Sequence, residues 1–242
     1  MADKKMYTKK FVFTVEGETE QWYLEWLRDQ IDKCEERKYN AAVDAKVQQS
    51  PKKFYKNANA KATPEVFHIC DVESGEAVHV EKLQNILSEM KEAKTQKNIE
   101  YRLGYSNFSF ELWVVLHKRN CNGILAHRRQ YLDHINKAFE ESFENLDQYK
   151  HEDNFKRCLG KMSLDDVRDA IKHAEIITEN NKRDANVLLQ YKGYTYYRDN
   201  PALSIHESVK MMFEECGISM KKYTEQHSAE TDDQKKKKKK DL

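Results

Sequence analysis

The chain has 242 residues, of which 34% are charged, and a formal net charge of +1. This length fits one large domain, or one domain with an appended subdomain. No apolar run approaches the roughly 20 residues that cross a bilayer, and the polar start of the chain does not resemble a signal peptide, so a membrane protein is not expected. The five cysteines are scattered, odd in number and without a Cys-x-x-Cys pair, which argues against disulfides and structural zinc and predicts a reducing, cytoplasmic location.

The net charge is unevenly distributed. Lysines fill positions 235–240, and without residues 235–242 the chain holds 36 basic and 40 acidic residues, a net charge of −4. Contact with nucleic acid would therefore need a local basic patch, or metal ions that invert the sign of an acidic site. Residues 225–242 are expected to form a disordered Lys-rich tail, which is either simply solvated or a phosphate-binding arm.

The first half of the chain alternates between apolar runs typical of strands and stripes typical of helices. Such an order predicts an α/β protein, with a mostly parallel four-stranded sheet flanked by helices on both faces. In chain order, we expect strands at 11–15, 42–49, 66–70 and 99–104, helices at 18–37 and 80–93, and a loop or short helix at 50–64.

The second half is expected to be helical. Only seven glycines and three prolines occur in the whole chain, in agreement with many helices. Ser163 followed by Asp166 has the spacing of a helix N-cap. We therefore predict a catalytic core over 1–110 and a helical subdomain over 111–224 packed on it. Its helices are expected at 110–118, within 125–144, from 163 onward and at 205–216.

Carboxylates follow two of the predicted strands at the point where each strand ends. Glu16 comes directly after the first strand, and Asp71 and Glu73 come directly after the third. The carboxyl ends of parallel strands meet at one edge of a sheet, where open α/β sheets bind their ligands. Clustered carboxylates suit a hard cation such as Mg²⁺, and enzymes use such sites mainly on phosphates. Glu20, one turn into the following helix, is either a further ligand or a solvated helix acid.

Several motifs in a fixed order resemble the RloB-like family of Toprim-related proteins, over roughly residues 9–215. They are Glu16-Gly17-x-Thr19-Glu20, Asp71-x-Glu73, Ser106-Asn107-x-x-Phe110-Glu111-Leu112-Trp113-x-x-Leu116-His117, Tyr149-Lys150 and Asn200-Pro201-Ala202-Leu203-Ser204. The resemblance implies a Toprim core, the metal-dependent phosphoryl-transfer fold of topoisomerases, primases and overcoming-lysogeny-defect nucleases. It also implies a role in bacterial or archaeal antiviral defence, often with a separate ATPase. This chain itself has no Gly-x-x-x-x-Gly-Lys-Ser/Thr loop.

The resemblance assigns roles to residues at these motifs. The catalytic candidates are Glu16, Asp71, Glu73, Glu111 and Lys150; the ligands for Mg²⁺ or Mn²⁺ are Glu16, Glu20, Asp71 and Glu73; and the substrate-binding candidates at the motifs are Gly17, Ser106, Asn107 and His117. Arg128 and Arg129 are further substrate-binding candidates because of their basic charge, and not because of the resemblance. Gly17 is expected to form a tight turn that lets a phosphate approach. Glu73 departs from the family, whose second motif usually reads Asp-x-Asp, and this departure would shift or weaken a second metal.

Each of the less certain candidates has an ordinary structural alternative. Glu111 could be an exposed acid that interacts with a helix dipole, His117 a satisfied structural histidine, and Lys150 a solvated lysine. Arg128 and Arg129, beside His127, form the densest basic cluster in the body of the chain. The tyrosines at 191, 194, 196 and 197 have the composition of a base-stacking surface, but equally that of a loop packed on the helical half.

The sequence therefore predicts a metal-dependent nuclease, acting on DNA, tRNA or another RNA and controlled by a partner ATPase. The competing hypothesis is a non-catalytic sensor or binding subunit with a degraded Toprim site, motivated by Glu73 and by the acidic body of the chain. A primase-like or topoisomerase-like transferase is a weaker third hypothesis. The oligomeric state is left open.

Overall fold

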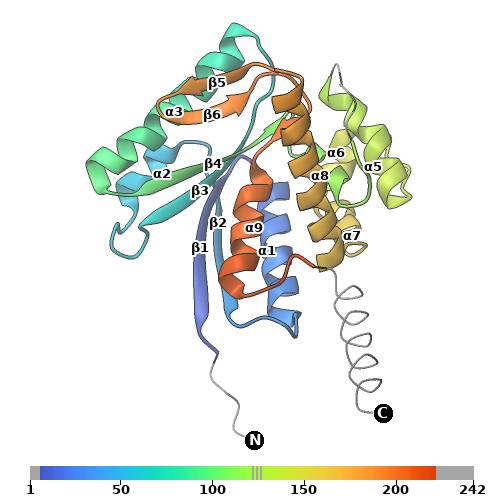
Figure 1. The fold of residues 1–242 in the computed structure, drawn as a ribbon, viewed down its shortest axis with the longest axis horizontal. Helices are drawn as coiled ribbons and strands as arrows, with labels where there is room; N and C mark the ends of the chain where they lie inside the picture. The colour runs from blue at the N-terminus through green and yellow to red at the C-terminus, as the bar shows by residue number, and fades with distance from the viewer. Residues whose placement is uncertain (1–5, 122, 124, 126, 222–242) are drawn as a thin grey trace, which may run out of the picture.

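A computed structural model describes residues 6–121, 123, 125 and 127–221 (Figure 1). The expected tail at 225–242, with its lysine run, lies outside the described residues. The central feature is a five-stranded sheet in the order β2-β1-β3-β4-β7. Its strands are β1 (Thr8–Val15), β2 (Asn40–Val47), β3 (Glu65–Asp71), β4 (Glu100–Asn107) and β7 (Ala202–Leu203).

Four of these strands are parallel, as the sequence predicts, and β7 is an additional antiparallel strand that pairs with β4. Val15 pairs with Ile69, and Asp71 pairs with Ser106, so the carboxyl ends of three neighbouring strands lie along one edge of the sheet. The residues that directly follow β1 and those that end β3 are therefore close in space. This edge is where parallel sheets collect ligand-binding residues.

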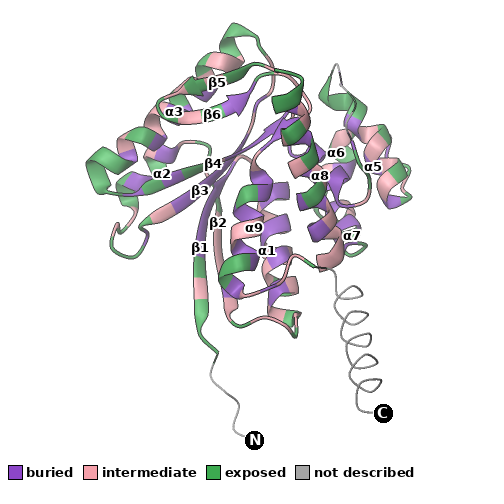
Figure 2. Ribbon diagram, viewed as in Figure 1, coloured by how far each residue is buried: buried purple, intermediate pink, exposed green. Residues whose placement is uncertain are grey.

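Helices cover both faces of the sheet, and the alternation of side chains along the strands divides the core into two layers. Phe13 and Val15 face the larger layer, whereas Val12 faces the smaller one. The larger layer contains α1 (Glu18–Lys33), α4 (Glu111–Leu116), α8 (Leu164–Arg183) and α9 (Ile205–Cys216); the smaller contains α2 (Pro51–Asn57), α3 (Ala77–Lys97) and a hairpin of β5 (Leu188–Tyr191) and β6 (Tyr194–Tyr197). In Figure 2 the strands between these layers are largely buried.

Local sequence explains where several helices begin and end. Tyr23, Leu24, Leu27 and Ile31 form the buried stripe of α1, which ends at Lys33, four residues before the expected end. The expected N-cap at Ser163 is confirmed, since its side chain accepts a hydrogen bond from the Asp166 amide. The segment expected to hold one helix at 125–144 contains a short 3₁₀ helix, η1 (Arg128–Gln130), and α5 (Tyr131–Phe139); α6 (Leu146–Lys150) and α7 (Glu152–Leu159) follow.

The tyrosine-rich segment forms the β5–β6 hairpin instead of a loop on the helical half. Tyr196 and Tyr197 are buried in the smaller layer, and Tyr196 packs edge-on against Tyr105 of β4. Tyr194 donates a hydrogen bond to the Tyr101 carbonyl. These rings belong mostly to the core, which leaves little of them for base stacking. Among the described residues, no helix is both long enough and apolar enough to span a membrane.

Candidate active site

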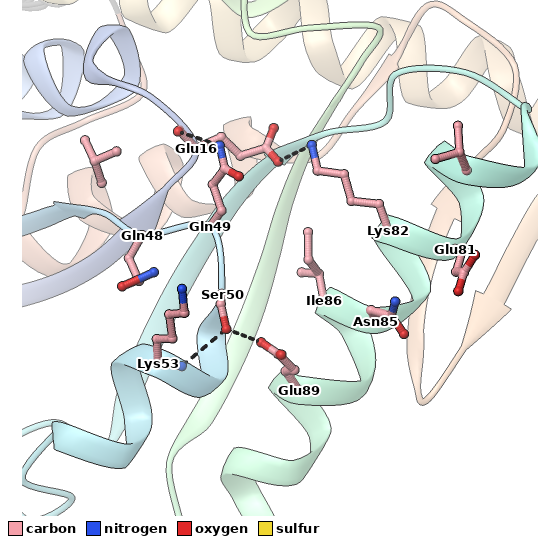
Figure 3. Close-up of a pocket in the computed structure, with 12 residues that line it drawn as sticks. Glu16, Gln48, Gln49, Ser50, Lys53, Glu81, Lys82, Asn85, Ile86 and Glu89 are labelled. Carbon is pink, nitrogen blue, oxygen red and sulfur yellow. Dashed lines mark hydrogen bonds and ion pairs between the residues drawn. The ribbon is translucent and has the colours of Figure 1, made fainter.

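Glu16 lies just beyond β1 and connects two strands and a helix. Its Oε2 accepts a hydrogen bond of 3.0 Å from the Asp71 backbone amide, which joins the carboxyl ends of β1 and β3. Its Oε1 lies 3.2 Å from Nζ of Lys82 on α3, and the side chain is only 11% exposed. Figure 3 shows Lys82 reaching from α3 toward this carboxylate. Glu16 is therefore fixed at the strand edge where the sequence predicts it.

Asp71 ends β3 among other acids. Burial raises the pKa of Asp71 well above its usual value, and the nearby charges of Glu16, Glu20 and Glu111 raise it further, while Lys150 acts in the opposite direction. A carboxyl group surrounded by three others holds its proton more tightly because ionisation would add a fourth negative charge. The electrostatics of Asp71 thus identify four acids that share one site.

Glu20 is buried, so it is not the solvated helix acid of the alternative hypothesis. Burial raises the pKa of Glu20, and Glu111 contributes in the same direction. Its Oε2 accepts a hydrogen bond from the Thr19 hydroxyl at 2.9 Å. A Cβ added at Gly17 would lie 3.2 Å from the same oxygen. Gly17 lies in the two-residue bend between β1 and α1, as expected, but its φ of −145° is one that any residue adopts, so the absence of a side chain matters for the space that it leaves for Glu20.

Glu111 begins α4 and is 1% exposed, which rules out the exposed dipole-interacting role. Its Oε1 lies 2.9 Å from Nζ of Lys150, and its Oε2 is buried without a hydrogen-bond partner in the described structure. Burial acts to lower the pKa of Lys150, but the charges of Glu111, Asp71 and Glu20 outweigh it and raise that pKa. Lys150 is thus a positively charged side chain that pairs with this acidic cluster. The hydroxyl of the neighbouring Tyr149 is buried without a hydrogen-bond partner among the described residues.

Glu73 stands apart from the other four acids. Its Oε1 accepts a hydrogen bond of 3.0 Å from Lys82, and its Oε2 lies 3.5 Å from Nε2 of His79. Burial acts to raise the pKa of Glu73, but Lys82, His79 and Arg128 outweigh it and lower that pKa. Lys82 therefore bridges Glu16 and Glu73, and Glu73 is connected to the cluster through this lysine.

The donor set fits a hard divalent cation chemically. Glu16, Glu20, Asp71 and Glu111 supply carboxylate oxygens, the ligands that Mg²⁺ and Mn²⁺ prefer. A buried oxygen of Glu111 has no hydrogen-bond partner in the described part of the chain. Within the part of the chain that the structure describes, no three histidine, cysteine, aspartate or glutamate side chains already converge as one metal site. Cation binding would therefore require these carboxylates to turn away from Lys82 and Lys150. Glu73 would take part only after its release from Lys82.

Three substrate-binding candidates are committed to internal contacts. The Ser106 hydroxyl donates to the Ser109 carbonyl at 2.8 Å, and the Asn107 amide donates to the Arg198 carbonyl at 2.8 Å. His117 is buried between the Trp113 carbonyl, 2.9 Å from Nδ1, and the Tyr23 hydroxyl, 3.1 Å from Nε2. Burial lowers the pKa of His117 to about 4. Ser106 and Asn107 hold the β4–α4 connection and His117 holds the end of α4, so these contacts support the helix that carries Glu111.

Arg128 and Arg129 are exposed on η1. Arg128 is close enough to Glu73 to help lower its pKa, which puts this arginine beside the carboxylate edge. The η1 turn is fixed by His127, whose side chain accepts a hydrogen bond from the Arg129 amide at 3.1 Å. The two exposed arginines therefore offer a basic patch for a phosphate, and Arg128 lies near Glu73.

The sequence prediction missed Lys82 and His79. They lie three residues apart on α3, a spacing that puts both on one helix face, and this helix directly follows the Glu73 turn. Burial acts to lower the pKa of Lys82, but Glu16 and Glu73 outweigh it and raise that pKa. The sequence did contain a signal for Lys82. It lies beside the apolar stripe of α3, the helix that follows the acidic end of β3.

The motifs, the fold and the carboxylate edge agree with a comparison to known families. A sequence model described as RloB-like protein matches residues 11–212, a range that contains every residue of the acidic cluster. No curated protein and no solved structure gave a match to the chain. Because the match covers most of the chain, it confirms the resemblance seen in the motifs. The protein belongs to the RloB-like family.

Proposed function

We propose that this protein is a metal-dependent nuclease with Toprim-type phosphoryl-transfer chemistry. The observation that carries the proposal is that Glu16, Glu20 and Glu111 lie near enough to Asp71, at the carboxyl end of β3, for their charges to raise its pKa. Four acids at one site are unfavourable unless a cation compensates them, and phosphate chemistry is the main use of such cations. The mostly parallel sheet with helices on both faces is consistent with a Toprim-like core.

The residues of the cluster have separate parts in this proposal. Glu16, Glu20, Asp71 and Glu111 would hold Mg²⁺ or Mn²⁺, which when bound would polarise a phosphate and lower the pKa of water. Asp71 holds a proton at a pH where an ordinary aspartate is ionised, and positive charge near it would release that proton. The ammonium groups of Lys82 and Lys150 flank the acids and would bind phosphate oxygens where negative charge develops.

The biological setting is part of the same proposal. The family resemblance points to antiviral defence in bacteria or archaea, with control by a separate ATPase. The absence of a phosphate-binding nucleotide loop from the sequence supports a separate polypeptide as the site of ATP binding. A nuclease that must be restrained in an uninfected cell would benefit from carboxylates that are held by lysines until substrate arrives.

The test is a cleavage assay on labelled single- and double-stranded DNA, tRNA and unstructured RNA, with Mg²⁺, Mn²⁺ or chelator. We expect cleavage of one substrate class that needs the divalent ion. Glu16→Gln should reduce it at least a hundredfold, because the amide keeps the shape of the side chain and loses its charge. Glu141→Gln is the matched control, since the Glu141 side chain is 12% exposed, about as much as that of Glu16, and is paired with Arg157 and Lys161. Equal cleavage by Glu16→Gln and wild type would refute the assignment.

A second function is supported by one specific observation. Lys82 pairs with Glu16 and Glu73, and Lys150 pairs with Glu111. Acids that are already paired with lysines also suit a non-catalytic binding subunit. The two functions differ in metal dependence. A nuclease should show thermal stabilisation by Mn²⁺ that disappears in Asp71→Ala, whereas a binding subunit should bind nucleic acid without responding to the ion.

A further inference from the structure

A groove leads away from Glu16 along the surface between the β2–α2 connection and α3 (Figure 3). Its volume is about 700 Å³, within the range of roughly 300–1,000 Å³ typical of small-molecule sites. One wall carries Val47, Gln48 and Lys53, and the other carries Val78, Asn85 and Ile86. Glu16 and Lys82 close one end, so the groove opens directly onto the acidic cluster.

The frame of this groove is fixed by its own contacts. The Glu89 carboxylate accepts hydrogen bonds from the Ser50 hydroxyl at 2.7 Å and from the Lys52 amide at 3.0 Å, which ties α2 to α3. The Gln49 side chain donates to the Glu16 carbonyl at 3.3 Å. The width of the groove and its position relative to Glu16 are therefore set before anything binds.

The remaining lining groups are free to meet a ligand. Val47 and Val78 are 46% and 65% exposed, unusual for large apolar side chains, and both line the groove. No hydrogen bond or ion pair joins the side-chain amides of Gln48 and Asn85, or the Lys53 ammonium, to the rest of the described chain. The groove thus offers apolar contact, amide donors and acceptors, and one cation.

The charge of the lining indicates which part of a nucleic acid fits. Glu16, Glu81 and Glu89 carry three negative charges against two positive charges on Lys53 and Lys82. A chain of phosphates would be repelled from such walls, whereas a nucleobase is uncharged, has apolar faces and carries hydrogen-bonding groups on its edges. Amide side chains can pair with those edges. The basic groups would instead meet phosphates at either end of the groove.

We propose that this groove is a nucleoside subsite, which holds the base and sugar next to the phosphate at Glu16. This inference rests on the proposed nuclease function and adds a site that would choose where a strand is cut. Val47, Val78 and Ile86 contact the faces of the base, Gln48 and Asn85 read its edge, and Lys53 contacts the phosphate on the far side.

The test combines protein variants with abasic substrates. Full-length protein is titrated, without divalent ions, into fluorescent eight-nucleotide DNA and RNA strands that lack one base at each position in turn. We expect one position at which base removal weakens binding at least fivefold. In the double variant Val78→Ser/Asn85→Ala, binding of the complete strand should weaken by a similar factor, and removal of that base should have no further effect. The variant Lys53→Ala provides a second, independent change in the same groove.

The controls are Val187→Ser and Lys56→Ala, since Val187 is exposed elsewhere and Lys56 lies on α2 outside the groove lining. Both should bind as wild type does and keep the single sensitive position. Binding with no sensitive position, or a sensitive position that survives in the double variant, would overturn the subsite. The nuclease proposal stands separately. Metal-dependent cleavage without a base position that depends on the groove residues would refute the subsite alone. A base position that depends on the groove residues, without metal-dependent cleavage, would refute the nuclease alone.

Discussion

Asp71 is the residue at which the electrostatics of the site are concentrated. Its carboxyl lies near Glu16, Glu20 and Glu111, whose charges raise its pKa, and its backbone amide donates a hydrogen bond to Glu16. Repulsion among these neighbouring carboxylates lowers the free energy of unfolding, and enzymes commonly have such destabilising groups at their active sites. Stability and function should therefore change in opposite directions when this charge is removed.

Asp71→Asn should make the protein more stable at high pH. The pKa of Asp71 is raised in the folded state, so its contribution to stability is present at low pH and is lost as pH rises through that raised value. We expect a gain of about 1 kcal/mol at pH 8 and a smaller one at pH 5, measured by urea unfolding. Asp133→Asn, on an exposed part of α5, should show no such pH dependence. Destabilisation by Asp71→Asn at pH 8 would contradict this electrostatic account.

Tyr149→Phe should leave stability unchanged or increase it by about 1 kcal/mol. The Tyr149 hydroxyl is fully buried without a hydrogen-bond partner in the described structure, and an unsatisfied buried polar group is unfavourable. The aromatic ring itself packs against Phe143 and Phe155 and is kept by the substitution. Thermal unfolding of both proteins measures the difference. A loss above about 1 kcal/mol would mean that the hydroxyl donates to a neighbour such as Glu111.

Single residues could be predicted where the chain itself brings them to the sheet edge. Glu16 and Asp71 follow directly from strands that end in acids, and both lie at the expected edge. Lys82 could not be predicted in the same way, because its role depends on how α3 crosses the sheet. Ser106 and His117 belong to a family motif, but a motif does not distinguish a side chain that binds substrate from one that holds its neighbours.

At the scale of elements, the short helix α4 carries Glu111 into the interior. All six of its residues are buried, and His117 closes its end through bonds to the Trp113 carbonyl and the Tyr23 hydroxyl of α1. The helix is thus fixed to α1, which carries Glu20. This contact between α4 and α1 positions Glu111 and Glu20 relative to each other.

His117→Gln should flatten the dependence of stability on pH. The pKa of His117 is lowered to about 4, below its usual 6.5, so its contribution is present above pH 6.5 and is lost as pH falls toward 4. One such histidine changes the free energy of unfolding by up to about 1.4 kcal/mol per pH unit. Urea unfolding from pH 4 to pH 7 should show a smaller slope for the variant. His151→Gln, an exposed change, should keep the wild-type slope; an unchanged slope in His117→Gln would contradict the prediction.

The first four strands and their helices could be predicted because their apolar patterns are long and local. The two-residue strand β7 could not, since it exists only through its pairing with β4 about a hundred residues earlier. The β5–β6 hairpin was hidden for a related reason. Its tyrosines alternate with polar residues, and only contact with Tyr105 and Tyr101 identifies them as core.

At the scale of the whole molecule, two sets of basic residues could contact a nucleic acid that reaches the acidic site. Arg128 lies near Glu73, Arg129 is exposed beside it on η1, and the lysine run at 235–240 belongs to a segment outside the described residues. Six clustered lysines attract phosphates without regard to sequence. Positioning of a strand therefore has to come from the body of the protein, and Arg128 and Arg129 are its best candidates.

Arg128→Ala/Arg129→Ala should weaken strand binding and reduce its dependence on salt. Each lost phosphate contact lowers the slope of log K against log salt by roughly 0.7 to 0.9, so the slope for the double variant should fall by about 1.4 to 1.8. Fluorescence anisotropy at several salt concentrations, with and without residues 235–242, measures this slope. The control is Lys172→Ala/Lys182→Ala on α8, a helix that carries none of the four clustered acids. If only removal of residues 235–242 changes binding, the lysine run is the true substrate contact.

The most direct test of the central claim is calorimetric titration of Mn²⁺ into the purified protein. The account predicts saturable binding to the wild type, at least tenfold weaker binding to Asp71→Asn, and unchanged binding to Glu141→Gln. Asp71 lies among Glu16, Glu20 and Glu111, whereas Glu141 is an acid engaged by Arg157 and Lys161 elsewhere in the fold. Absence of binding to the wild type, or equal binding to Asp71→Asn, would contradict the claim that these four carboxylates form one cation site.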